Sequence, residues 1–360
     1  MTSLMSGERA RIDAFLAPLV ADPMLRIVLT GAGTSAFIGD CLAPALVARL
    51  HRRVEPIATT ELLSGPNLRL PCGSRTLLVS FARSGNSPES VAALELAEHI
   101  LAGRVHHLVI TCNREGALAL RAQGMPNACV VLMPDATHDR GFAMTSSFSA
   151  MLLAGALAFG ATTAAAVARL SQSAATLLPE ATALGERLVV GRYERVVYLG
   201  SNELRGLAAE AALKLLELTD GRVVAVADST LGFRHGPKTI INDRTLVAVM
   251  LSNDAYTRAY DADLLKELAR DRRAGGILAL AARPDDIGNV DRIIYAGMGD
   301  ATDLEVAPLH ALVAQSFALL QSLALGLTPD RPDPAGTVNR VVQGVTIHPW
   351  NGTGRDVPRR

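Results

Sequence analysis

The 360-residue chain has no excess charge of either sign, because 35 lysines and arginines balance 35 aspartates and glutamates. A neutral chain excludes nucleic-acid binding that depends on a broad positive surface. Cysteines are few (Cys41, Cys72, Cys112 and Cys129), and none of their spacings is that of a CxxC pair or a zinc ligand set. We therefore expect no metal site, and reduced, mostly buried thiols in a cytoplasmic protein.

A secretory signal is also missing, since residues 1–10 carry both charge signs and lack a long apolar segment. The longest apolar stretch, 150–167, is alanine-rich and contains two glycines, so it predicts one buried core helix and no membrane span. No basic helix-turn-helix precedes Leu25, which excludes the usual DNA-binding regulator. The 360 residues are enough for two domains, and because 49% of them are hydrophobic, a sizeable core can be buried.

An internal repeat organises the sequence. Three short apolar runs recur at a constant offset of 169 residues: 26–29 with 195–198, 75–79 with 244–248, and 108–110 with 277–279. Each run is followed by a polar or glycine-rich turn, as buried parallel strands are. Helical patterns lie between the runs, at 87–101 and at 257–270, and the first of them opens with a Ser-Pro-Glu start signal.

Strands that alternate with helices predict an α/β fold with two tandem modules, each a parallel sheet flanked by helices. The expected organisation is an N-terminal helical segment (1–24), a first module (25–170), a linker helix (171–192), a second module (193–327) and a C-terminal tail (328–360). The tail starts with a proline-rich spacer and becomes apolar from Val338, which predicts a flap over the site or an oligomer contact. A disordered end is the alternative.

Two turns have the composition of phosphate-binding loops. The first, residues 30–35 (Thr-Gly-Ala-Gly-Thr-Ser), follows the first predicted strand, but it lacks the third glycine of a dinucleotide motif and the lysine of a Walker loop. The second, residues 80–89, gathers Arg83, Ser84, Asn86 and Ser87 around one glycine. Hydroxyls, a guanidinium and backbone N–H groups at a strand-to-helix turn can converge on a phosphate. Ordinary helix capping would explain Ser87 alone.

A helix in the second module carries the strongest catalytic pattern. Glu210, Lys214 and Glu217 are spaced by four and three residues, so they share one helix face. A solvated face with a Glu–Lys pair is the alternative, but the intervening alanines favour close packing. A loop follows at 232–238 (Gly-Phe-Arg-His-Gly-Pro-Lys), where His235 can reach a substrate and exchange a proton near pH 7.

These turns and this helix resemble the SIS domain of sugar-phosphate isomerases, whose best-known example is the isomerase half of glucosamine-6-phosphate synthase. The resemblance implies that the turns hold the phosphate of a hexose 6-phosphate. We accordingly assign to phosphate binding Thr34, Ser35, Arg83, Ser84, Asn86 and Ser87. Two positions depart from the synthase pattern, because Ala82 replaces a phosphate-binding serine and Arg83 stands where the synthase has a glutamine.

The same resemblance implies the catalytic roles. Glu217 is the base that moves a proton between C1 and C2, and His235 assists ring opening from the neighbouring subunit, so a homodimer or higher homo-oligomer with shared sites is expected. Lys214 contacts the substrate, and Glu210 is a supporting carboxylate. The reaction requires no cofactor and no metal.

Five stretches (30–40, 83–91, 137–147, 232–238 and 336–344) are similar to the tagatose-6-phosphate ketose/aldose isomerase group, whose members act as galactosamine-6-phosphate deaminases. The expected reaction converts galactosamine 6-phosphate and water to tagatose 6-phosphate and ammonia. A ketose/aldose isomerase without deamination would use the same residues, and a non-catalytic sugar-phosphate sensor is a further alternative. The C4 configuration of the sugar and the physiological direction stay open.

Overall fold

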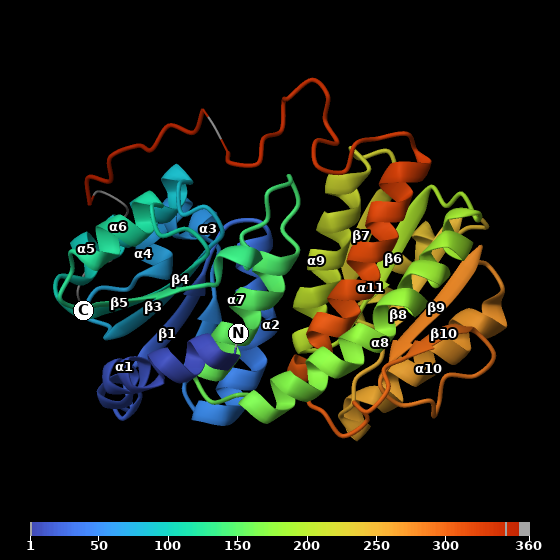
Figure 1. Ribbon diagram of the computed structural model, residues 1–360, viewed down its shortest axis with the longest axis horizontal. Helices are drawn as coiled ribbons and strands as arrows, with labels where there is room; N and C mark the ends of the chain where they lie inside the picture. The colour runs from blue at the N-terminus through green and yellow to red at the C-terminus, as the bar shows by residue number, and fades with distance from the viewer. Residues whose placement is uncertain (1, 343, 353–360) are drawn as a thin grey trace.

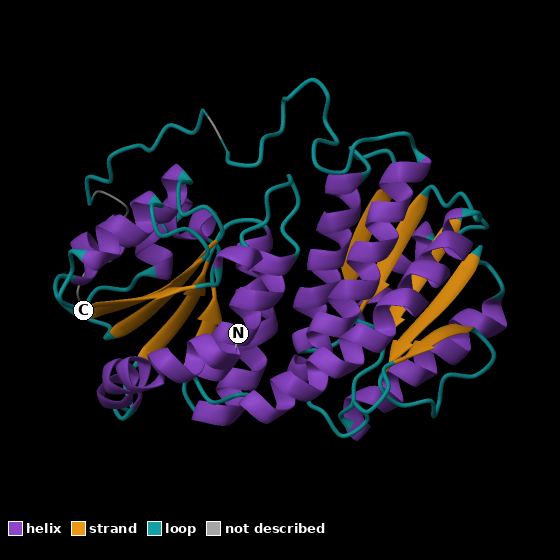
Figure 2. Cartoon of the chain, in the orientation of Figure 1, coloured by secondary structure: helices purple, strands orange, loops and turns teal. Residues whose placement is uncertain are grey.

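The computed structural model describes residues 2–342 and 344–352, with the side chains of residues 2–6 left out. Met1, at the start of the predicted N-terminal segment, and Gln343 and residues 353–360 of the predicted tail lie outside the described residues. The described chain forms two parallel five-stranded sheets, each covered by helices on both faces (Figure 1; Figure 2). This confirms the predicted fold class.

The two sheets have the same strand order. In the first sheet the order is β2-β1-β3-β4-β5, and in the second it is β7-β6-β8-β9-β10. The first contains β1 (Arg26–Thr30), β2 (Arg53–Pro56), β3 (Thr76–Ala82), β4 (Val105–Thr111) and β5 (Ala128–Leu132). The second contains β6 (Arg195–Leu199), β7 (Val224–Asp228), β8 (Thr245–Met250), β9 (Gly276–Ala281) and β10 (Asp291–Ile294).

β1 and β3 are buried along their whole length, because helices cover both faces of a parallel sheet. The helices around the first sheet are α1 (Thr2–Val20), α2 (Thr34–Leu50), α3 (Thr59–Ser64), α4 (Pro66–Arg69), α5 (Pro88–Leu101), α6 (Ala117–Gln123), η1 (Asp135–Thr137) and α7 (Ser146–Ala158). Those around the second are α8 (Ala164–Val189), α9 (Glu203–Leu218), η2 (Gly232–Arg234), η3 (Pro237–Ile240), α10 (Ala255–Asp271) and α11 (Asp303–Ala324).

The prediction of one buried helix over 150–167 is wrong, because two helices occupy this stretch. α7 ends at Ala158, and Gly160 takes a left-handed conformation with φ 68°. α8 then starts after Thr163, whose hydroxyl accepts a hydrogen bond from the Ala166 N–H at 3.1 Å. Glycine adopts this conformation without steric cost, and threonine is a good helix cap. α8 is also continuous with most of the segment predicted as a linker helix.

A helix crossing joins the modules. α2 packs against α9, and at this crossing Gly206 of α9 lies directly against the backbone of Asp40 and Cys41 of α2. Within the second module, α11 packs against α8 and α9. By length and composition α11 could cross a membrane, but 61% of its most apolar window is buried inside the protein, which is the environment of a core helix. The α2–α9 crossing brings the first turn of one module to the charged helix of the other.

The C-terminal tail crosses from the end of α11 to the helices of the first module (Figure 1). Within residues 328–342 and 344–352 it forms neither helix nor strand. It is nevertheless attached at several points, since the Phe142 N–H donates to the Asp330 carbonyl at 3.1 Å. Near its end, the Trp350 ring packs edge-on against His99 of α5, with ring centroids 5.6 Å apart.

Candidate active site

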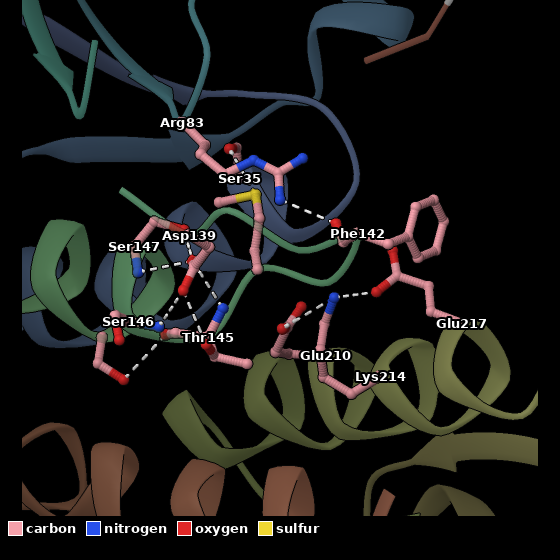
Figure 3. A network of polar contacts seen from close by, with 12 residues as sticks. Ser35, Arg83, Asp139, Phe142, Thr145, Ser146, Ser147, Glu210, Lys214 and Glu217 are labelled. Carbon is pink, nitrogen blue, oxygen red and sulfur yellow. Dashed lines mark hydrogen bonds and ion pairs between the residues drawn. The ribbon is translucent and has the colours of Figure 1, made fainter. Parts of the chain in front are cut away.

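Three charged residues lie together on one face of α9, as their spacing predicts. Lys214 is 1% exposed and forms ion pairs with Glu217 and with Glu210, the latter at 3.7 Å. Figure 3 shows the Lys214 ammonium between the two carboxylates. A buried charge is costly unless it is paired, so this arrangement is not that of a solvated helix face. Glu217 is the most accessible of the three, at 22% exposure, and is therefore the one open to a substrate.

The Glu210 carboxyl group has an unusual environment. It is 1% exposed, and neither of its oxygens accepts a well-formed hydrogen bond from any described residue. Burial raises the pKa of Glu210 to about 8; the Lys214 ammonium opposes this rise and the Glu217 carboxylate adds to it. At neutral pH Glu210 is therefore mostly protonated. Lys214 then balances the charge of Glu217 alone.

The stability of the protein should therefore depend on the protonation of Glu210. Because the pKa in the folded state lies above the ordinary 4.5, the folded state holds an extra proton between about pH 4.5 and 8, and stability falls as pH rises through this window. Glu210→Gln mimics the neutral acid and removes this dependence. In urea unfolding from about pH 5 to 9, the free energy of unfolding of the variant should rise relative to that of wild type by a few kcal/mol. Parallel stability curves would rule out the raised pKa.

The first phosphate-type turn opens α2 beside this cluster. Thr34 and Ser35, the first two residues of α2, are both buried. Among the described residues, the Ser35 hydroxyl hydrogen-bonds only with the Met144 sulfur, at 3.8 Å, and the Thr30 hydroxyl at the end of β1 has no partner. Gly33 has φ 55°, which turns the backbone sharply before the helix. Buried hydroxyls without acceptors are suited to bind an anion.

The second turn joins β3 to α5. Ser84 and Ser87 are half-buried; the Ser84 hydroxyl accepts the Asn86 N–H at 3.3 Å, and the Ser87 hydroxyl pairs with that of Ser90 at 2.6 Å. Ser87 stands at the N-cap of α5, but among the described residues its side chain accepts no backbone N–H of the helix. The Asn86 side-chain carbonyl accepts from the Ala117 N–H at 2.9 Å, so this amide orients α6. Ser84 and Ser87 remain available to a phosphate.

Arg83 lies between this turn and the rest of the site. Its side chain is buried, and its guanidinium donates to the carbonyl oxygens of Gly141 (3.3 Å), Phe142 (2.8 Å) and Arg340 (2.6 Å). Burial lowers the pKa of Arg83 to about 10, and the nearby Arg340 adds to this effect. All three acceptors are backbone groups of other segments. The Arg83 guanidinium thus binds the loop before α7 and the tail.

The pattern-based assignment missed Asp139, which organises that loop. Its carboxylate accepts hydrogen bonds from the N–H groups of Thr145 (2.9 Å), Ser146 (3.0 Å) and Ser147 (3.0 Å), and from the Thr145 and Ser147 hydroxyls (2.8 and 2.5 Å). Burial acts to raise the pKa of Asp139, but these hydrogen bonds outweigh it and lower the pKa. Figure 3 shows this loop between Arg83 and α9. An aspartate shortly before Thr-Ser-Ser at a helix start is the signal that sequence reading could have used.

His235 takes no part in the contacts of this cluster. It is exposed on the loop between η2 and η3, and in the described part of the chain no hydrogen bond or ion pair joins its ring to Glu217. Neighbouring residues tie the loop to α10, since Arg234 and Lys238 both pair with Glu267. Within one chain, the two phosphate-type turns and the α9 cluster (Glu210, Lys214 and Glu217) therefore form without a contribution from His235.

The strand ends of the second sheet are arranged differently. There the Asp261 carboxylate of α10 accepts from the hydroxyls of Ser201 (2.9 Å) and Thr230 (2.7 Å) and from the Ser252 N–H (2.9 Å). An internal carboxylate thus satisfies the donors at the edge where parallel sheets usually bind ligands. Among the described residues, the equivalent edge of the first sheet gives the hydroxyls of Thr30 and Ser35 no carboxylate acceptor. These donors are therefore suited to bind an anion.

The loop of residues 138–145 is called the Asp139 loop below. A cleft of about 820 Å³ lies beside it, between α7, α8 and α11. Its lining combines leucines of these helices with polar residues of the loop, and it includes none of the described residues assigned to catalysis or phosphate binding. We therefore place the candidate active site at the α9 cluster and the two turns, and not in this cleft.

Tandem parallel sheets with hydroxyl-rich turns and a buried Glu-Lys-Glu face define the class of SIS-domain enzymes, and the SIS domain family matches residues 21–161. A relative from Streptomyces coelicolor is 49% identical over 97% of this chain and 91% of its own length. The D-galactosamine-6-phosphate deaminase AgaS of Escherichia coli is 47% identical over 95% of this chain and 90% of its own. The chain belongs to the AgaS family of SIS-domain enzymes.

A solved structure agrees with this assignment. The tagatose-6-phosphate ketose/aldose isomerase of Escherichia coli superposes with a TM-score of 0.89 and 43% identity, over 97% of this chain and 92% of that one. The family, the enzyme class and the sugar-phosphate chemistry predicted from the motifs are confirmed by these relatives.

Proposed function

We propose that this protein is a galactosamine-6-phosphate deaminase/isomerase, which converts galactosamine 6-phosphate and water to tagatose 6-phosphate and ammonia. The observation that carries the proposal is the buried Glu210-Lys214-Glu217 face next to the buried hydroxyls of the first module. Its relatives of 47–49% identity over nearly the whole chain support the substrate. Ser35, Ser84 and Ser87, with Thr34 beside them, would hold the 6-phosphate.

In the proposed reaction, His235 assists opening of the sugar ring to the aldehyde. Glu217 then removes the C2 proton, giving an enolamine, and returns a proton to C1, which leaves a ketimine at C2. Water adds to the ketimine, the C–N bond breaks, and ammonia leaves. A positioned carboxylate suits this proton transfer, and the Lys214 ammonium beside it can stabilise the charge that develops on the substrate oxygen.

Ammonia release from galactosamine 6-phosphate, compared with glucosamine 6-phosphate, tests the proposal directly. We expect the galacto substrate to be preferred by tenfold or more in kcat/KM, since a site built to hydrogen-bond one hydroxyl configuration leaves polar groups unpaired with its epimer. Interconversion of ketose and aldose 6-phosphates without ammonia release would favour the plain isomerase. Phosphosugar binding without turnover of any substrate would favour the sensor.

We further propose a cytoplasmic homodimer, or a higher homo-oligomer, in which each active site takes His235 from the neighbouring subunit. The exposure of His235 supports this, as does the lack of any hydrogen bond or ion pair between its ring and Glu217 among the described residues. Mixed dimers of Glu217→Gln and His235→Ala subunits should then regain about half of the wild-type activity, because one of the two sites is intact. If verified mixed dimers stay as inactive as either parent, the shared site is refuted.

A further inference from the structure

We propose that Arg83 is a positioning residue that fastens the Asp139 loop and the C-terminal tail over the α9 cluster, and that it does not bind the sugar phosphate. The side chain is 6% exposed; its Nη1 donates to the carbonyls of Gly141 and Phe142, and its Nη2 donates to that of Arg340. A guanidinium presents its donors in a rigid planar fork, so the same group cannot turn to a phosphate without releasing these segments.

The tail residue that Arg83 holds makes a reciprocal contact. The Arg340 guanidinium donates to the Asp139 carbonyl, while the Arg340 carbonyl accepts from Arg83. Two arginines thus each donate to a backbone carbonyl, and together they join β3, the loop before α7 and the tail. The Asp330 carbonyl, which accepts from the Phe142 N–H, adds a second attachment of the tail to the same loop.

The Asp139 loop, held by Arg83, lies next to residues predicted to bind or act on the substrate. Met144 of the loop contacts the Ser35 hydroxyl, and the Glu217 carboxylate lies close enough to influence the Arg83 charge. Figure 3 shows Arg83 directed at Phe142, with the loop between it and the α9 cluster. Loss of the Arg83 fork would therefore free the tail and displace the loop that borders both the phosphate turn and the base.

The tail carries its own reporter, because Trp350 is the single tryptophan of the chain. It is half-buried against His99, so acrylamide quenching of its fluorescence measures how often the tail is undocked. In Arg83→Ala and Arg83→Lys the undocked fraction should rise by about tenfold or more, since several hydrogen bonds to a charged group are lost and a lysine cannot replace the fork. Arg187→Ala, which removes an exposed arginine of α8 in the second module, is the matched control and should leave quenching unchanged.

Arg340→Ala provides a second test on the tail itself, where a substitution does not disturb the folded modules. Arg340→Ala should increase Trp350 quenching, as the Arg83 variants do. The inhibition constant of inorganic phosphate for Arg83→Lys should stay within about threefold of that for wild type, because the phosphate donors remain. Unchanged Trp350 quenching in folded Arg83→Lys and Arg340→Ala would overturn the proposal. The inference rests on the proposed site for its functional meaning, but the fluorescence test does not depend on the substrate.

Discussion

Glu217→Gln is expected to lower kcat for ammonia release by about 10³-fold with a small change in KM, because general acid–base catalysis contributes about 10²–10⁴-fold. The amide has nearly the same shape as the carboxylate and can still accept a hydrogen bond from Lys214. It cannot accept the C2 proton. The loss should therefore appear in the chemical step and not in substrate binding, as measured by steady-state kinetics with galactosamine 6-phosphate.

Glu203→Gln is the matched control, because it makes the same change in the first turn of the same helix, away from the cluster. Its kcat should remain within about threefold of wild type, because Glu203 lies at the opposite end of α9 from Glu217. Incorporation of solvent deuterium at C1 of the product would report the proton transfer separately from hydrolysis. Activity of Glu217→Gln within tenfold of wild type would show that another group is the base.

The substitution Gly206→Ala is expected to destabilise the protein by about 1–3 kcal/mol and to lower activity, since it overpacks the helix crossing that joins the modules. A Cβ at this position would lie 2.6 Å from the Asp40 Cβ and 2.8 Å from the backbone of Asp40 and Cys41. Backbone atoms cannot rotate away as a side chain can, so α2 and α9 must separate. α2 carries Thr34, and a misplacement of about 1 Å can cost about 10²-fold in rate.

Gly7→Ala makes the same change in α1, where a Cβ meets no atom within 4 Å. This control should be neutral or slightly stabilising, because alanine is a better helix former than glycine. Urea unfolding and kcat/KM of both variants check the expectation. If Gly206→Ala unfolds like wild type and keeps full activity, the crossing tolerates the extra atom and does not set the relative position of the two modules.

Patterns over short distances in the chain predicted several features correctly. Apolar runs with a constant offset indicated the strands of two similar sheets, and the spacing of Glu210, Lys214 and Glu217 placed them on one face of a helix. The break between α7 and α8 was misjudged, since alanine-rich residues on both sides of Gly160 have helical propensity and the turn depends on one glycine and one cap. Local propensity is a weak guide where a single residue ends a helix.

The amino-acid sequence by itself determined the strand and helix order, the hydroxyl-rich turns and the acid–lysine–acid face, because these follow from periodicity and from residue type. Only the tertiary structure decided which of these groups are free. It showed that Arg83 is engaged with the Arg340 carbonyl, 257 residues away in the chain, and that the Asp261 carboxylate accepts from hydroxyls at the strand ends of the second sheet. Every residue has a backbone carbonyl, so no sequence motif marks such an acceptor, and only the packing of distant segments brings it to its donor.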